Sequence, residues 1–160
     1  MKRVNAIYCH PRYQEAYRKI QELEKERTFC SHPMTHFLDV ARLASIFSLE
    51  EGLKIDKEII YSAALLHDIG RHEEYLYGTP HQEASARIAA PILEDCGFDG
   101  KEIRQITEAI LAHRDKSVKK EKNLKGFIYR ADKMSRNCFD CRAEEQCNWS
   151  KKKKNMEIQY

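Results

Sequence analysis

The strongest constraint on the fold is a set of histidines and aspartates that fall on the apolar faces, or at the ends, of predicted helices. An imidazole or a carboxylate is costly on a buried helix face unless a partner satisfies it. A single such histidine is usually a hydrogen-bonded core residue, but several on successive helices can satisfy one another by converging on a metal ion. The set comprises His36, His67, Asp68, His81, His113 and Asp132.

Apolar periodicity, with start and stop signals, predicts the helices that carry this set. Ser31, Thr79 and Asp99 are the predicted caps, Gly70 is a predicted stop, and Pro91 is expected to kink or shorten its helix. Strand signals are poor. We therefore expect an all-α, single-domain helical bundle of residues 1–160 with a core at 30–136 and a Cys/Lys-rich tail at 137–160. The expected main helices are six: 12–27, 31–51, 56–69, one from 79, one from 99, and 124–136.

Composition favours an ordinary globular protein, with 42% hydrophobic and 33% charged residues. No apolar run approaches the roughly 20 residues that span a bilayer, and none follows the first residues as in a signal peptide. We expect a cytoplasmic protein with no membrane partner. The basic runs at 116–125 and 151–154 lack interleaved aromatic residues, so a nucleic-acid partner is not expected.

The chain has six cysteines, which in a cytoplasmic protein favours free thiols or metal binding over disulfides. Cys138, Cys141 and Cys147 are clustered, and Cys30 or Cys9 could supply a fourth zinc ligand. Their spacing is loose for a structural zinc site, so buried or free thiols are the simpler interpretation.

The six-residue set restricts the choice of metal. Imidazole and carboxylate ligands suit Fe, Mn, Zn, Co or Ni. Six protein ligands are too many for one catalytic ion with an open position, so one or two ions are expected, with two favoured. Asp68 could bridge them through its two oxygens. Two divalent ions and two aspartates would leave positive charge that attracts a phosphate.

The motif His67-Asp68-Ile69-Gly70-Arg71 resembles the signature of the HD superfamily of metal-dependent phosphohydrolases. His36 with Val40-Ala41 resembles the first helix of that family, and Ala131-Asp132-Lys133 resembles its last. The added histidines, His81 and His113, resemble the subset with dinuclear sites, one branch of which hydrolyses diadenosine tetraphosphate and similar nucleotides.

Two departures from the family pattern are visible. Arg71 stands where the mononuclear nucleotidases of the superfamily carry a glutamate, three residues after the motif's aspartate. The Gly-Tyr-Pro element of the cyclic-dinucleotide phosphodiesterases is also missing.

The resemblance implies hydrolysis of a phosphate ester or anhydride, in a nucleotide or another small phosphate, by a metal-activated water. Asp68 would act in catalysis with Arg71, and Arg71, Lys133 and His32 would contact the substrate. Two alternatives remain open: an HD-fold di-iron oxygenase, and a non-catalytic nucleotide- or metal-binding module. A homodimer is also left open. His10 and His72 are expected at the surface.

Overall fold

The computed structural model describes residues 1–160 and contains helices but no strands. A 3₁₀ helix precedes the last α-helix at Lys116–Lys120 (η1), and another follows it at Cys138–Asp140 (η2). None of the helices combines the length and the apolar character needed to cross a membrane. The α-helices are α1 (Lys2–Cys9), α2 (Pro11–Leu23), α3 (Met34–Glu50), α4 (Lys57–Leu66), α5 (Arg71–Tyr77), α6 (His81–Asp95), α7 (Gly100–Ala112) and α8 (Leu124–Met134).

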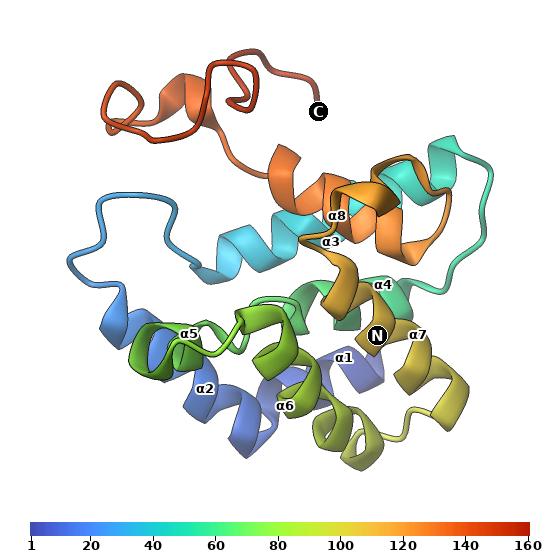
Figure 1. The fold of residues 1–160 in the computed structure, drawn as a ribbon. Helices are drawn as coiled ribbons and strands as arrows, with labels where there is room; N and C mark the ends of the chain where they lie inside the picture. The colour runs from blue at the N-terminus through green and yellow to red at the C-terminus, as the bar shows by residue number, and fades with distance from the viewer.

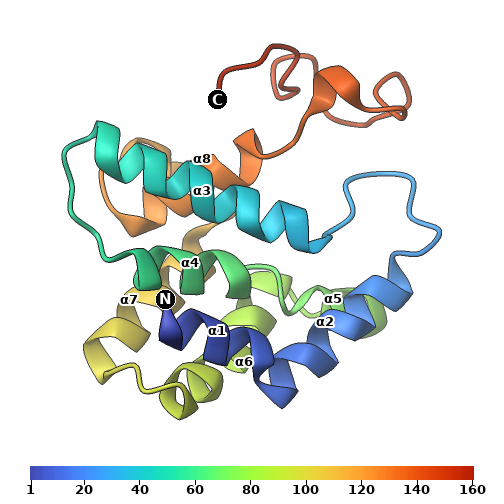
Figure 2. The same ribbon diagram turned by 180° about the vertical axis from the view of Figure 1, so that it is seen from behind.

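The helices enclose one hydrophobic core of 30 buried residues. Helix α3 packs against α8 and α4, and α7 packs against α6, α8 and α4 (Figure 1). Helices α1 and α2 lie on the opposite side of α4 from α3, as the view from behind shows (Figure 2). The chain after α8 runs above the α3–α8 layer, away from α1, α2 and α6 (Figures 1 and 2). This arrangement directs one end or one face of each of α3, α4, α6, α7 and α8 toward a common interior region.

The all-α prediction is confirmed, and the six predicted helices correspond to α2, α3, α4, α6, α7 and α8, with ends within about four residues. The capping box at Asp99 is present, with Asp99 accepting from Lys101 and Glu102 backbone amides. Helices α1 and α5 are not predicted by the pattern. They have only 8 and 7 residues, which is too short for a clear periodic signal.

Several predicted helix signals are wrong. The caps expected at Ser31 and Thr79 are not formed, because α3 and α6 start after Pro33 and Pro80 with no side-chain cap. Proline at these places already fixes an extended turn into the helix. Of the two effects expected of Pro91, a kink or a shorter helix, the shortening does not occur, because α6 continues to Asp95.

Gly70 is not the stop of α4 that the sequence predicted, because α4 ends at Leu66 and Gly70 directly precedes α5. Its φ of −84° is ordinary for any residue. Its backbone instead lies against α6: Gly70 N–H donates to Ser85 Oγ at 2.8 Å, and an added Cβ would lie 2.4 Å from Ser85 N and 2.7 Å from Ala84 Cβ. The glycine therefore permits close approach of the turn after α4 to α6.

We expect Gly70→Ala to destabilise the protein by about 1–3 kcal/mol, because the obstructing atoms include rigid backbone. For a chain of this size that corresponds to a melting temperature lower by about 3–10 °C, measured by circular dichroism in chelator-containing buffer. Gly100→Ala is the matched control, since nothing lies within 4 Å of its added Cβ at the start of α7. Equal melting temperatures for the two variants would show that the close approach has no energetic weight.

Candidate metal centre

The six predicted ligands meet at the centre of the bundle. His67 is the C-cap of α4 and Asp68 follows it, so both lie where that helix ends inside the core. Their exposed fractions are 0%. The remaining four come from other helices and are also buried: His36 in the first turn of α3, His81 as the first residue of α6, His113 as the C-cap of α7, and Asp132 in α8.

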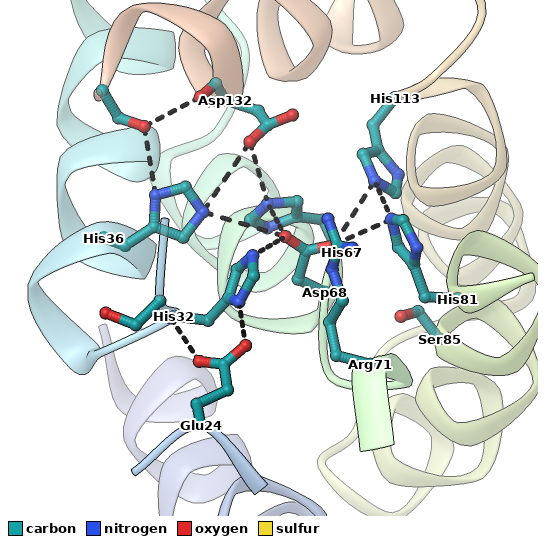
Figure 3. A network of polar contacts seen from close by, with 12 residues as sticks. Glu24, His32, His36, His67, Asp68, Arg71, His81, Ser85, His113 and Asp132 are labelled. Atoms are coloured by element: carbon teal, nitrogen blue, oxygen red, sulfur yellow. Dashed lines mark hydrogen bonds and ion pairs between the residues drawn. The ribbon is translucent and has the colours of Figure 1, made fainter. Parts of the chain in front are cut away.

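Asp68 divides its two carboxylate oxygens between two groups of histidines (Figure 3). Its Oδ2 lies 3.3 Å from His67 Nε2 and 3.8 Å from His36 Nε2. Its Oδ1 lies 3.1 Å from His81 Nε2 and 3.4 Å from His113 Nε2. Asp132 Oδ1 belongs to the first group, at 3.7 Å from His36 Nε2 and 3.8 Å from His67 Nε2.

Backbone carbonyls fix the proton position on two of these histidines. His67 donates from Nδ1 to the carbonyl of Ala64 at 2.7 Å. His113 donates from Nδ1 to the carbonyl of Ile110 at 2.6 Å. A carbonyl oxygen only accepts, so Nδ1 must carry the proton, and in the neutral ring Nε2 is left with a lone pair.

Side chains fix the proton on the other two. His81 donates from Nδ1 to Glu74 Oε2 at 2.7 Å. Ser135 Oγ donates to the carbonyl of Asp132 at 2.9 Å, so it accepts from His36 Nδ1 at 3.1 Å. In each case Nε2 again faces the centre without a proton.

Of the four Nε2 lone pairs that result, only that of His36 has a protein donor, Arg136 Nη2 at 3.2 Å. His81 Nε2 and His113 Nε2 lie 3.1 Å apart, although both are acceptors in this tautomer. Three buried atoms at the centre have no hydrogen-bond partner: His32 Nε2, His67 Nε2 and Asp68 Oδ2. Histidines that bind metal characteristically donate their other N–H to a carbonyl or carboxylate, as these do. The residues present therefore fit a bound cation.

Ligand-type atoms gather in two sets, within 4.8 Å of one another in each. The first set is His36, His67, Asp68 and Asp132, and the second is Asp68, His81 and His113. Asp68 is common to both. The arrangement could hold one ion in each set, with Asp68 between them, and leaves open positions in both coordination spheres.

The electrostatics keep the carboxylates ionised. Burial opposes ionisation of Asp68 and Asp132, but nearby positive charge outweighs it. His67 and Arg71 hold the pKa of Asp68 well below its usual range. His67 and Lys133 do the same for the pKa of Asp132. Burial lowers the pKa of His36 to about 4. The pKa of His67 is about 9, because the two aspartates outweigh its burial. A cation that binds His67 Nε2 therefore displaces the proton from that atom.

Arg71 and Lys133, the two expected phosphate contacts, lie at the edge of the centre. Arg71 Nε donates to Asp68 Oδ1 at 3.1 Å and its Nη1 to Glu74 Oε2 at 3.0 Å. Lys133 donates to Asp132 and to the carbonyl of His113. Their side chains are 22% and 36% exposed, more than any ligand, and Glu74, which is 27% exposed, lies beside Arg71.

His32, the third expected substrate contact, is buried and points inward. Its Nε2 lies 3.3 Å from Asp68 Oδ2. Its Nδ1 donates to Glu24 Oε1 at 2.5 Å, and Glu24 also accepts from the Tyr75 hydroxyl at 2.6 Å. His32 therefore presents an unprotonated Nε2 to the centre in the same way as the ligands, next to the first set.

The expectation that His72 is a surface residue is wrong. His72 is 7% exposed in α5, and its Nδ1 donates to the carbonyl of Ile69. His10 is partly buried and accepts from the backbone of Arg12 at the start of α2.

Sequence reasoning missed three supporting residues: Glu24, Glu74 and Ser135. Ser135 lies one turn after Asp132, a weak signal that spacing could have given. Nothing marked the two glutamates among 25 acidic residues.

Comparison with known proteins agrees with this geometry. The HD domain family profile matches residues 34–137. An uncharacterized protein of Clostridium beijerinckii is 44% identical over 160 residues, which covers 100% of both chains. A crystal structure of a predicted HD superfamily hydrolase from an uncultured Thermotogales bacterium has the same fold, with a TM-score of 0.66 at 23% identity, over 93% of this chain and 82% of that chain.

More distant relatives are much longer. Ribonuclease Y of Oleidesulfovibrio alaskensis is 28% identical over 151 residues, and this match covers 94% of this chain but 27% of the relative. Ribonuclease Y of Acetivibrio thermocellus is 28% identical over 104 residues, or 18% of its length. The family profile covers most of the present chain and includes five of the helices that supply the centre, and the chain therefore belongs to the HD domain family.

Proposed function

We propose that this protein is a metal-dependent phosphohydrolase that acts on a nucleotide or another small phosphate ester or anhydride. The observation that carries the proposal is the division of the Asp68 carboxylate, with Oδ2 toward His36 and His67 and Oδ1 toward His81 and His113. A carboxylate so placed is suited to hold two divalent transition-metal ions side by side. Membership of the HD domain family and the fold shared with a predicted HD superfamily hydrolase support the assignment.

The residues of the centre are proposed to have two roles, metal binding and phosphate binding. His36, His67, Asp68 and Asp132 would hold one ion, and Asp68, His81 and His113 the other. Ions in such sites supply Lewis acidity toward a phosphate and lower the pKa of water. Arg71 and Lys133, at the exposed rim, would bind the phosphate oxygens, and Arg71 can do so with two parallel N–H donors. Burial of the ligand side chains excludes bulk water from behind the centre.

The direct test is a metal-reconstitution screen. Purified protein is analysed for metal, stripped, and reloaded with Mn, Fe, Co, Ni or Zn. It is then assayed with p-nitrophenyl phosphate, nucleoside mono- and diphosphates, dinucleoside polyphosphates and a short RNA. Metal-dependent release of phosphate or nucleotide that is lost in His67→Ala supports the proposal. A metal-loaded protein inactive on the whole panel would overturn it.

The RNA substrate is included because the two ribonuclease Y relatives favour a second candidate, cleavage of an RNA phosphodiester. The two candidates use the same centre and differ in the substrate that fits the rim. Turnover of RNA with none of the small phosphates would select the second. Oxygen consumption by the iron-loaded protein, without phosphate release, would instead select the oxygenase alternative.

Arg71→Ala is expected to lower kcat/KM for a small phosphate by about 10–100-fold, chiefly through KM, because it removes a charge-assisted contact to the phosphate. Metal content should stay at the wild-type value. Arg114→Ala is the control, since Arg114 also pairs with Glu74 but is 53% exposed. If Arg71→Ala loses metal while KM is unchanged, the arginine positions Asp68 rather than binding substrate.

A further inference from the structure

The C-terminal segment, residues 138–160, follows a defined course with little hydrophobic support. Only Cys138 and Ala143 are buried in it. Its order comes from turns, the short helix η2 and a few polar contacts, such as Asn155 Nδ2 donating to the carbonyls of Lys133 and Arg136. Two buried side chains offset little of the conformational entropy lost by 23 ordered residues. Small segments of this kind usually depend on a disulfide or a metal.

Cysteines from two distant parts of the chain gather at this segment. Cys138, Cys141 and Cys147 lie within it, and Cys30 lies in the loop between α2 and α3. Arg136 Nη1 donates to the carbonyl of Ser31 at 2.8 Å, which joins the residue after Cys30 to the residue two before Cys138. In both ribbon views this loop and the C-terminal segment lie on the same side of the molecule (Figures 1 and 2).

The environment of Cys30 reflects this proximity. Burial raises the pKa of its thiol, and Cys147, Cys138 and Cys141 raise it further, whereas Arg136 lowers it. Cys30 also has φ of +35°, in the left-handed region that non-glycine residues seldom adopt. Cys9, at the end of α1, and Cys96, after α6, are not among its neighbours.

Local geometry around the three C-terminal cysteines suits thiolate ligands. Cys138 is the first residue of the single turn η2 and Cys141 is its C-cap, and a 3₁₀ turn brings residues i and i+3 to the same side. The backbone N–H of Trp149 donates to Cys147 Sγ at 3.5 Å, a contact that favours a thiolate. Arg136 and Lys154 supply positive charge beside the sulfurs.

We propose that Cys30, Cys138, Cys141 and Cys147 bind one structural zinc ion, which fastens the C-terminal segment to the loop between α2 and α3. Four thiolates from a C-x₂-C pair and two further cysteines form a common tetrahedral zinc site. The thiols are not among the sets whose ligand atoms all lie within 4.8 Å of one another, whereas neighbouring sulfurs around zinc lie about 3.8 Å apart. The proposal therefore requires the loop and the C-terminal segment to approach more closely when zinc binds.

The proposed zinc site would also support the metal centre. Cys30 is two residues from His32, whose Nε2 faces Asp68. Cys138 is two residues from Arg136, whose Nη2 donates to His36 Nε2. A zinc ion shared by these two segments would hold the His32 contact in place and keep Arg136 beside the centre, although Arg136 must release His36 Nε2 when that atom binds a metal ion. The proposal of a zinc site does not depend on the proposed phosphohydrolase activity.

Chelator-dependent alkylation of the wild-type protein tests the site without altering the fold. Protein purified in reductant is treated with iodoacetamide, with and without a chelator, and each cysteine is quantified by peptide mass spectrometry. We expect Cys30, Cys138, Cys141 and Cys147 to be protected until the chelator is added, whereas Cys9 and Cys96 react equally in both conditions. Equal reactivity of the four thiols with and without chelator would overturn the proposal, as would a disulfide among them.

Cobalt substitution then assigns the ligands, because thiolate-to-cobalt charge-transfer absorption arises only from cysteine ligands. Reduced wild-type protein should show this absorption, and Cys30→Ser, Cys138→Ser, Cys141→Ser and Cys147→Ser should each lower it and remove one zinc per chain. Cys9→Ser and Cys96→Ser are the matched controls and should keep both signals. Unchanged absorption in Cys30→Ser, or its loss in Cys9→Ser, would overturn the assignment of the fourth ligand. Where a variant fails to fold, the role of that cysteine is decided by the alkylation experiment on the wild-type protein.

Discussion

Asp68→Asn is expected to reduce metal binding at both sets of the centre and to lower phosphate release by at least about 10³-fold. Asp68 is the only residue common to the two sets, and it supplies one oxygen to each. An amide keeps the size of the side chain but removes its charge, and one of its two former oxygens becomes an NH₂ donor. The expected phenotype is therefore loss of function with the fold retained.

The measurement pairs metal analysis of the purified variant with the hydrolysis assay at saturating metal. Asp39→Asn is the matched control, because Asp39 lies on α3 near His36 but is paired with Arg42 at the surface. It should keep wild-type metal content and rate. Wild-type metal content in Asp68→Asn would contradict the assignment of Asp68 as the shared ligand.

The ligands of the centre could be predicted from the sequence because each carries a local signal. His36, His113 and Asp132 each lie in line with the apolar stripe of a helix, and His67-Asp68 ends one. A polar residue in such a place predicts its own burial. Helix periodicity indicates the face of the helix on which a residue lies. That information was sufficient to predict that the six ligands converge in the core.

The supporting residues could not be predicted for the same physical reason. Glu24 reaches His32 from α2's end, and Tyr75 reaches Glu24 across 51 residues of sequence. Such contacts depend on how helices pack, and the periodicity of one helix contains no information about its neighbour. The prediction for His72 was wrong for a similar reason. Helix α5 is short, and the burial of His72 depends on α2 and α6, which pack against α5.

Substitution of His113 is expected to distinguish a centre that holds two ions from one that holds a single ion. His113 and His81 are the two histidines of the second set. Both contact Asp68 through Oδ1 alone, so their loss should spare the Oδ2 side. We expect His113→Ala to lose one of two bound ions and to lower the hydrolysis rate by about 10²-fold or more, because one source of charge neutralisation is removed. His36, His67 and Asp132 still hold the other ion.

His36→Ala is the complementary variant and should impair the opposite set, while His10→Ala, a histidine outside the centre, should leave both the metal count and the rate unchanged. The decisive quantity is metal per chain, measured together with turnover under the same conditions. Two ions retained in His113→Ala would place the second ion elsewhere. Loss of both ions would mean that the two sets bind metal cooperatively through Asp68. A wild-type centre that holds only one ion would instead be mononuclear. In that case His81 and His113 would act as hydrogen-bonding partners of the Asp68 carboxylate.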